Sequence, residues 1–253
     1  MLLTTPQVHL KYDGTFEGLL SIIFALFELK LEPISINPLN KSVPTLFEDS
    51  LFVDTDPVKA QRVWKAWVNI SNRRYARLAY LSFLSDKPYK DMLICRYAKK
   101  LFSDKSHTFY KNMLDEDAYQ LYQTARKVSH EKHRFTGFIR FQKTHDGLYY
   151  APIAPDNDIL RLLAPHFCKR FSSQAWIIYD VKRDFGLYYD LKSVSEIKLK
   201  NPKMDIKSGR ITDDARHLEE KFYDDLWQHY YKAINIPERK NTRQMKRLMP
   251  VRY

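Results

Sequence analysis

Residues 130–190 constrain the fold of this chain more than any other stretch, because they combine short β-favouring runs with tight turns. Pairs of such runs flank the turns at residues 144–147 and 181–184, a pattern that predicts two β-hairpins. Between the hairpins, residues 158–171 repeat their apolar side chains with the period of a helix. The sequence therefore predicts hairpin, helix and hairpin, with strands at 138–142, 148–153, 176–180 and 185–189.

The N-terminal part begins with a predicted strand at residues 7–12 and a turn that contains Gly14. A predicted helix at 16–31 follows, for which Thr15 can serve as the N-cap. A glycine turn between a strand and a helix can also hold a phosphate, but no GxGxxG pattern or Lys-Ser/Thr pair is present here. An ordinary capped turn is therefore favoured.

The remaining elements follow from prolines and caps. Three prolines make residues 32–56 irregular, with one predicted strand at 50–54, and Asp56-Pro57 then opens a helical region that lasts to about residue 134. We expect an α+β fold in one compact unit, with subregions 1–56, 57–134 and 135–253. The other predicted elements are helices at 58–70, 72–84, 89–102 and 116–133, a strand at 194–199, a C-terminal helix from Thr212 and a basic tail.

Positive charge is concentrated in one part of the sequence. Residues 57–112 contain 13 Lys and Arg against 3 Asp and Glu, whereas residues 1–50 contain 3 basic and 6 acidic side chains. With a net charge of +12, this distribution suits a polyanionic partner, nucleic acid first and an anionic membrane surface second. Solvated helix faces would explain the same charges equally well.

Several classes of protein are excluded by composition. Cys95 and Cys168 are too few for a disulfide framework or a cysteine-ligated cluster, and their apolar neighbours predict small core side chains. We expect a cytoplasmic protein without cofactor or metal. The apolar stretch 19–27 is too short to span a bilayer and lacks the features of a signal peptide, so no membrane association is expected.

Candidate catalytic residues are few and weakly supported. The run His130-Glu131-Lys132-His133 has HExH spacing and not the HExxH spacing of zinc proteases, which favours a solvated helix end over a metal site. Asp180 adjoins the second hairpin turn, where aspartates commonly bind their own backbone. An acid/base role is the alternative for four residues near predicted element ends: Glu131, His133, His166 and Asp180.

Basic and aromatic residues alternate through the same region, which is the better functional signal. Aromatic side chains beside cations on a sheet can stack nucleobases while Lys and Arg bind phosphates. By the period of two, about half of these aromatic side chains must face the core. We therefore predict that the cations, rather than the aromatic residues, bind nucleic acid: Arg134, Arg140, Arg170, Lys182, Arg183, Arg243 and Arg247.

The whole sequence resembles a bacterial family of uncharacterised "probable DNA metabolism proteins". The motifs that carry the resemblance are specific together, although each alone is not. They are Tyr12-Asp13-Gly14-Thr15-Phe16-Glu17-Gly18, Thr55-Asp56-Pro57, Arg62-Val63-Trp64, Glu131 with His133-Arg134, Gly137-Phe138-Ile139-Arg140-Phe141, Ala164-Pro165-His166-Phe167 with Arg170-Phe171, Trp176-Ile177-Ile178-Tyr179-Asp180 with Arg183, and Met249-Pro250-Val251-Arg252-Tyr253.

What the resemblance implies is a context and not an activity. Members of that family are encoded beside a DNA modification/repair radical-SAM protein, and a related domain is fused to some uracil-DNA-glycosylase-superfamily proteins. The present chain lacks the CxxxCxxC motif of a radical-SAM enzyme, so it cannot hold such a cluster itself. The first hypothesis is a DNA-binding accessory protein in DNA repair or modification that acts with a radical-SAM partner. The alternative is a DNA-repair enzyme of the glycosylase or nuclease type that uses the four catalytic candidates, and a protein–protein adaptor ranks third.

Overall fold

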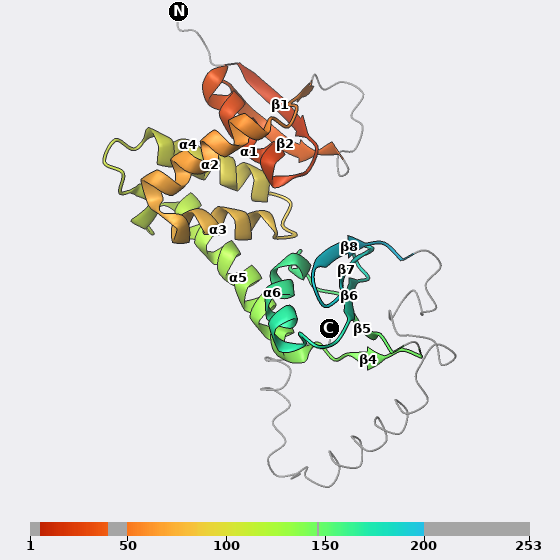
Figure 1. The fold of residues 1–253 in the computed structure, drawn as a ribbon. Helices are drawn as coiled ribbons and strands as arrows, with labels where there is room; N and C mark the ends of the chain where they lie inside the picture. Colours follow the sequence, from red (N-terminus) through yellow and green to blue (C-terminus); the bar gives the residue numbers. More distant parts are fainter. Residues whose placement is uncertain (1–5, 40–49, 146, 200–253) are drawn as a thin grey trace, which may run out of the picture. The chain divides into compact units, whose positions relative to one another are not determined.

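The computed structural model describes residues 6–39, 50–145 and 147–199 (Figure 1). It confirms an α+β protein, in which helices dominate the N-terminal half and a mixed sheet dominates the C-terminal half. The chain divides into two compact units, Met1–Ser129 and His130–Tyr253, with the division inside one long helix. The expected organisation as one compact unit stays a prediction.

The sheet of the N-terminal unit has three parallel strands in the order β2-β1-β3. The central strand β1 (Gln7–Tyr12) is followed by the helix α1 (Phe16–Glu28), and both agree with the prediction. The expectation that residues 32–56 hold only one strand was wrong, because β2 (Glu32–Pro38) precedes β3 (Ser50–Phe52). Within the described residues β2 pairs only with β1, and prolines are tolerated on such an edge because their missing N–H is not needed there.

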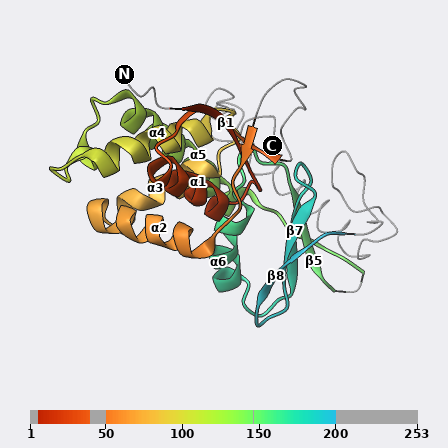
Figure 2. The ribbon, with the colours of Figure 1, turned by 90° about the horizontal axis from the view of Figure 1, so that it is seen from above.

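Four predicted helices follow, each within one or two residues of its expected start. They are α2 (Pro57–Ser71), α3 (Arg73–Phe83), α4 (Lys90–Ser103) and α5 (Glu116–Phe138), with a short 3-10 turn at Phe109–Lys111. Figure 2 shows α1, α2 and α3 gathered in this unit, where α2 contacts both of the others. The buried side chains of Trp67, Ile94 and Leu101 belong to one core with those of α1 and β1.

The sheet of the C-terminal unit has five strands in the order β4-β5-β6-β7-β8. Both predicted hairpins form, since β4 pairs antiparallel with β5 and β6 pairs antiparallel with β7. The two hairpins are not separate, however, because β5 and β6 pair in parallel and are connected by the helix α6. This βαβ unit was not predicted from the sequence. The bounds are β4 Gln142–Lys143, β5 Tyr149–Ile153, α6 Leu160–Arg170, β6 Trp176–Asp180, β7 Phe185–Tyr189 and β8 Val194–Ile197.

One strand boundary was wrong. The predicted strand at 138–142 is mostly absent, because α5 continues to Phe138 and β4 begins only at Gln142. Aromatic and β-branched residues such as Phe138 and Ile139 suit a strand by propensity, but the helix that precedes them extends by one more turn. The predicted C-terminal helix from Thr212, Arg243 and Arg247 lie outside the described residues. In the part of the chain described here, no helix combines the length and apolarity needed to cross a membrane.

Candidate nucleic-acid interface

The N-termini of α1 and α2 are held side by side by a small hydrogen-bonded network. Thr15 caps α1, since its hydroxyl accepts the Gly18 amide at 2.9 Å, and Asp56 caps α2 by accepting the Val58 amide at 2.8 Å. The Asp13 carboxylate joins the two ends, because it accepts the Thr15 amide at 2.8 Å and the Thr55 hydroxyl at 2.7 Å. Burial raises the pKa of Asp13, but these hydrogen bonds outweigh it and leave the pKa below its ordinary value.

Gly18 is required for this close approach. A Cβ atom at Gly18 would lie 2.2 Å from the Asp13 carboxylate and 2.9 Å from the Thr55 hydroxyl, so a side chain there would displace both. A second link lies one turn further along, where the Asp56 amide donates to the Ser21 hydroxyl at 3.0 Å. The glycine therefore allows the first turns of two helices to lie against each other.

The turn between α2 and α3 places a third helix next to α1 and α2. Asn72 has a φ of 98°, in the left-handed region, and its side chain accepts the amides of Arg74 at 2.9 Å and Tyr75 at 3.2 Å. The Asn72 side chain thus caps the new helix directly after α2 ends. The chain reverses within one residue, and α3 packs back along α2.

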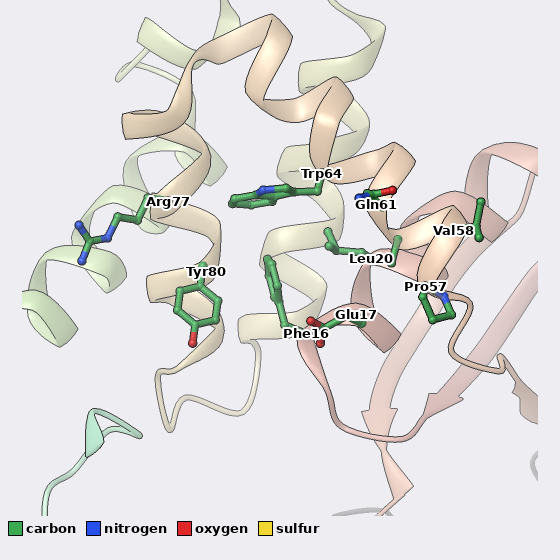
Figure 3. Close-up of a pocket in the computed structure, with 10 residues that line it drawn as sticks. Phe16, Glu17, Leu20, Pro57, Val58, Gln61, Trp64, Arg77 and Tyr80 are labelled. Atoms are coloured by element: carbon green, nitrogen blue, oxygen red, sulfur yellow. The ribbon is translucent and has the colours of Figure 1, made fainter. Parts of the chain in front are cut away.

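A pocket of about 560 Å³ lies where α1, α2 and α3 meet (Figure 3). This volume is in the range of small-molecule sites. In Figure 3 the Trp64 ring lies above those of Phe16 and Tyr80, with Arg77 on one side and Pro57 on the other. The lining residues are Phe16, Glu17, Leu20, Pro57, Val58, Ala60, Gln61, Trp64, Arg77 and Tyr80.

Aromatic rings form one part of the pocket, and aliphatic and polar side chains form the rest. The Phe16 ring meets the Trp64 ring edge to face at 5.7 Å between centroids, and the Tyr80 ring in the same way at 5.2 Å. Such contacts fix the rings in place. Glu17 adds a carboxylate and Gln61 an amide to this lining. The pocket thus combines an aromatic surface with side chains that can donate or accept hydrogen bonds.

Two of the three helices around the pocket, α2 and α3, carry positive charge and no negative charge. Neither α2 nor α3 contains an Asp or Glu. Lys59 forms an ion pair with Glu28 at 2.9 Å, and both Lys59 and Arg62 lie over the Phe24 ring. Five exposed cations on α2 and α3 form no ion pair with any described residue: Arg62, Lys65, Arg73, Arg74 and Arg77.

Two of these cations occupy an unfavourable position for the folded chain. Arg73 and Arg74 lie in the first turn of α3, where the helix dipole is positive and each added cation costs about 0.3–1 kcal/mol. An anion placed there would be attracted by both guanidinium groups and by the dipole. The arrangement is therefore suited to phosphate groups, with an aromatic pocket beside it.

The cations predicted in the hairpins have other partners. Arg183 is mostly buried and donates to the Pro155 carbonyl at 3.1 Å, the Asp156 carbonyl at 2.7 Å and the Asp180 carboxylate at 2.9 Å. Lys182 is exposed and its ammonium lies 3.4 Å from the same Asp156 carbonyl. The guanidinium of Arg183 thus fastens the loop after β5 to the β6–β7 turn, and its predicted phosphate contact stays a prediction.

Asp180 has a structural role in this turn. It is fully buried and accepts the amides of Lys182 at 3.0 Å and Arg183 at 3.2 Å, as expected for a turn aspartate. Burial raises the pKa of this carboxyl, and the neighbouring Arg183 only partly offsets the effect. A raised carboxyl pKa is also found in general acids, but here the oxygen atoms already accept three hydrogen bonds.

Glu131 and His133 do not face the same way. Glu131 is buried, and its carboxylate accepts the Asp156 amide at 2.8 Å and the Asn157 amide at 2.9 Å. His133 is exposed two residues further along α5, and a separation of two residues turns a helix by about 200°. The helix therefore places the two predicted catalytic side chains on nearly opposite sides.

The other candidates are distributed over separate elements of the C-terminal unit. His166 is half-buried on α6, its ring lies edge-on to that of Phe167, and its Nε2 atom has no hydrogen-bond partner among the described residues. Arg170, at the end of α6, is exposed beside the Phe171 ring. Arg134 is half-buried on α5, and Arg140 is exposed between α5 and β4. The use of these residues in catalysis or DNA binding stays a prediction.

A metal centre is not apparent in the part of the chain that the structure describes, where no three His, Cys, Asp or Glu side chains gather as ligands. The charge of α2 and α3 is evident in the sequence, but the pocket is not, because Phe16, Trp64 and Tyr80 are distant from one another along the chain. Two signals would have pointed to it: the absence of acidic residues from two consecutive helices, and the pair Arg73-Arg74 at a helix start.

Comparison with known proteins gives a family but no activity. None of the curated proteins matches the sequence. Among solved structures, a pGpG-specific phosphodiesterase, PggH from Vibrio cholerae, aligns over 91% of this chain and 100% of that chain. The identity is 10% and the TM-score 0.34, a value too low to support a shared fold.

A family model described as "Domain of unknown function (DUF4130)" matches residues 88–253. The pocket and the arginines of α3 lie N-terminal to the matched segment. Because the match covers well over half of the 253 residues, the chain belongs to the DUF4130 family.

Proposed function

We propose that the protein is a cytoplasmic DNA-binding accessory protein in DNA repair or modification, and that it acts with a radical-SAM enzyme. The observation that carries the DNA-binding part is the acid-free pair α2 and α3, which exposes Lys65, Arg73, Arg74 and Arg77 beside an aromatic pocket. The radical-SAM partner is supported by the resemblance to the family encoded beside such an enzyme. It is a separate part of the proposal with a separate test.

Electrostatics favour nucleic acid over other anions of similar charge. A phosphate backbone presents charges at regular intervals, so it can contact several cations at once and release the counterions it had condensed. The exposed cations of α2 and α3 have no competing carboxylate on either helix, which leaves their charge available to a ligand. The aromatic rings beside them suit DNA more than an acidic peptide, because nucleobases stack on such rings.

The test is the salt dependence of DNA binding, measured by fluorescence anisotropy with a labelled oligonucleotide. The Arg73→Gln/Arg74→Gln variant should bind more weakly. The slope of log K against log salt should also become shallower by about 1.4 for a single strand, or about 0.7 for each lost phosphate contact. No detectable DNA binding by the unmodified protein at low salt would overturn the proposal.

A matched variant locates the interface. The double variant Arg170→Gln/Lys182→Gln also removes two positive charges, but it removes them from the C-terminal unit, where DNA-binding residues were predicted from the sequence. We expect it to change the salt slope much less than the α3 variant. The opposite order would move the interface to the C-terminal unit. The partner is tested separately: co-purification of the tagged protein with a radical-SAM enzyme from the same cells supports this part of the proposal, and absence of such an enzyme from the purified material contradicts it.

A further inference from the structure

We propose that the pocket between α1, α2 and α3 holds one unstacked nucleobase of a DNA strand whose phosphates bind the arginines of α3. This inference rests on the proposed DNA binding and adds the group that the site recognises. Three properties of the pocket support it: its shape, its polar groups and its position beside the cations.

The shape fits a planar heterocycle. The rings of Phe16, Trp64 and Tyr80 line a space of about 560 Å³, which has room for a base and its sugar. Phe16 contacts both of the other rings edge to face, so the aromatic surface is already assembled before a ligand enters. A pre-formed site loses little conformational entropy on binding.

The polar groups in the lining match the edge of a base. A carboxylate can only accept hydrogen bonds, whereas an amide can both accept and donate. Glu17 and Gln61 therefore provide partners for the hydrogen-bond donors and acceptors that every nucleobase carries on its Watson–Crick edge. An aliphatic ligand such as a lipid chain would leave both side chains without a partner.

The position of the pocket beside the arginines of α3 allows one DNA strand to be bound through a base and through its phosphates together. Arg77 belongs to the pocket lining, and it is four residues after Arg73 and three after Arg74 on α3. Residues at these spacings are neighbours on a helix surface. A strand that binds the two outer arginines through its phosphates would thus have a base next to the pocket. Negative charge on the strand complements the acid-free surface of α2 and α3.

The experiment blocks the pocket without removing a core contact. Val58 lines the pocket and is 77% exposed, so Val58→Trp adds a neutral bulky side chain at the opening and leaves the packing beneath it intact. The matched control is Leu114→Trp, because Leu114 is 98% exposed and lies outside the pocket. Both proteins and the unmodified one are titrated with a short single strand and with an abasic strand of equal length.

We expect the unmodified protein to bind the base-containing strand about 5- to 140-fold more tightly than the abasic one, the ratio that corresponds to one stacked base at about 1–3 kcal/mol. Val58→Trp should remove this preference and leave abasic binding unchanged, whereas Leu114→Trp should change neither. Irradiation of a strand containing 5-iodouracil should link it to Phe16, Trp64 or Tyr80, as mapped by mass spectrometry.

Three outcomes would overturn the inference. Equal binding of the two strands by the unmodified protein leaves DNA binding in place and removes the base pocket. A preference that survives Val58→Trp, or crosslinks that map only outside the pocket, places the base elsewhere. Absence of binding to either strand removes both the inference and the proposed function, so the two failures are distinguishable.

Discussion

In the C-terminal unit Arg183 donates to two carbonyls and a buried carboxylate, whereas in the N-terminal unit Arg73 and Arg74 are exposed and form no ion pair with any described residue. The sequence predicted phosphate binding for Arg183, whereas Arg73 and Arg74 were noted only as part of the basic segment 57–112. The difference lies in their surroundings. A guanidinium that already satisfies buried acceptors contributes to folding, and one beside a helix N-terminus without a carboxylate remains available to an anion.

The largest effect on stability is expected where a cation is removed from a buried partner. Arg183→Ala leaves the fully buried Asp180 carboxylate without its ion pair, and breaking such a pair typically costs about 3–5 kcal/mol. The pKa of Asp180, already raised by burial, should rise further. Chemical denaturation measures the loss. The control Arg170→Ala, at an exposed position, should stay within about 0.5 kcal/mol, and equal effects of the two would contradict the structural role.

An intermediate effect is expected for a paired carboxylate of the N-terminal unit. Asp117 accepts hydrogen bonds from Arg96 at 2.9 Å and Lys100 at 2.8 Å. Burial raises the pKa of Asp117, but these cations outweigh it and hold the pKa below its ordinary value. The ionised carboxylate is therefore the form that stabilises the fold. Asp117→Asn should cost about 1 kcal/mol at neutral pH, since both cations are about half exposed.

The pH dependence of this effect follows from the sign of the shift. A lowered folded-state pKa gives stability that is present above the ordinary carboxyl value of about 4 and is lost as the pH falls through the folded-state pKa. The difference between Asp117→Asn and the unmodified protein should thus shrink in acid. Denaturation curves at several pH values measure it. A difference that grows as the pH falls would show that the pair does not act in this way.

The smallest effect on stability per charge, with the opposite sign, is expected for the cations of α3. Arg73→Gln/Arg74→Gln removes charges that oppose the helix dipole, so stability should rise by about 0.3–1 kcal/mol for each charge. The same variant is expected to weaken DNA binding. Thermal unfolding at low salt measures the gain. A loss of stability would mean that these arginines, like Arg183, serve the fold, and the contrast between the two units would disappear.

The sequence determined local structure well, because local signals are strong in this chain. The caps Thr15 and Asp56, the proline at position 57 and the turn residues of the hairpins all act within a few residues. Their effects therefore appear in the sequence at the correct positions. The strand β2 was missed for the same reason. Its prolines are a local signal against a strand, but they are tolerated because β2 lies at the edge of the described sheet.

The functional candidates were harder to predict, because their roles depend on partners distant in the sequence. The sequence by itself determined the residue types, the acid-free run of α2 and α3 and the start of each helix. Only the tertiary structure decided that Phe16, Trp64 and Tyr80 line one pocket. It also decided that Glu131 and Arg183 hold the loop after β5. Burial and hydrogen bonding between remote segments arise only when the chain packs. They decide whether a charged side chain stabilises the fold or remains available to bind a ligand.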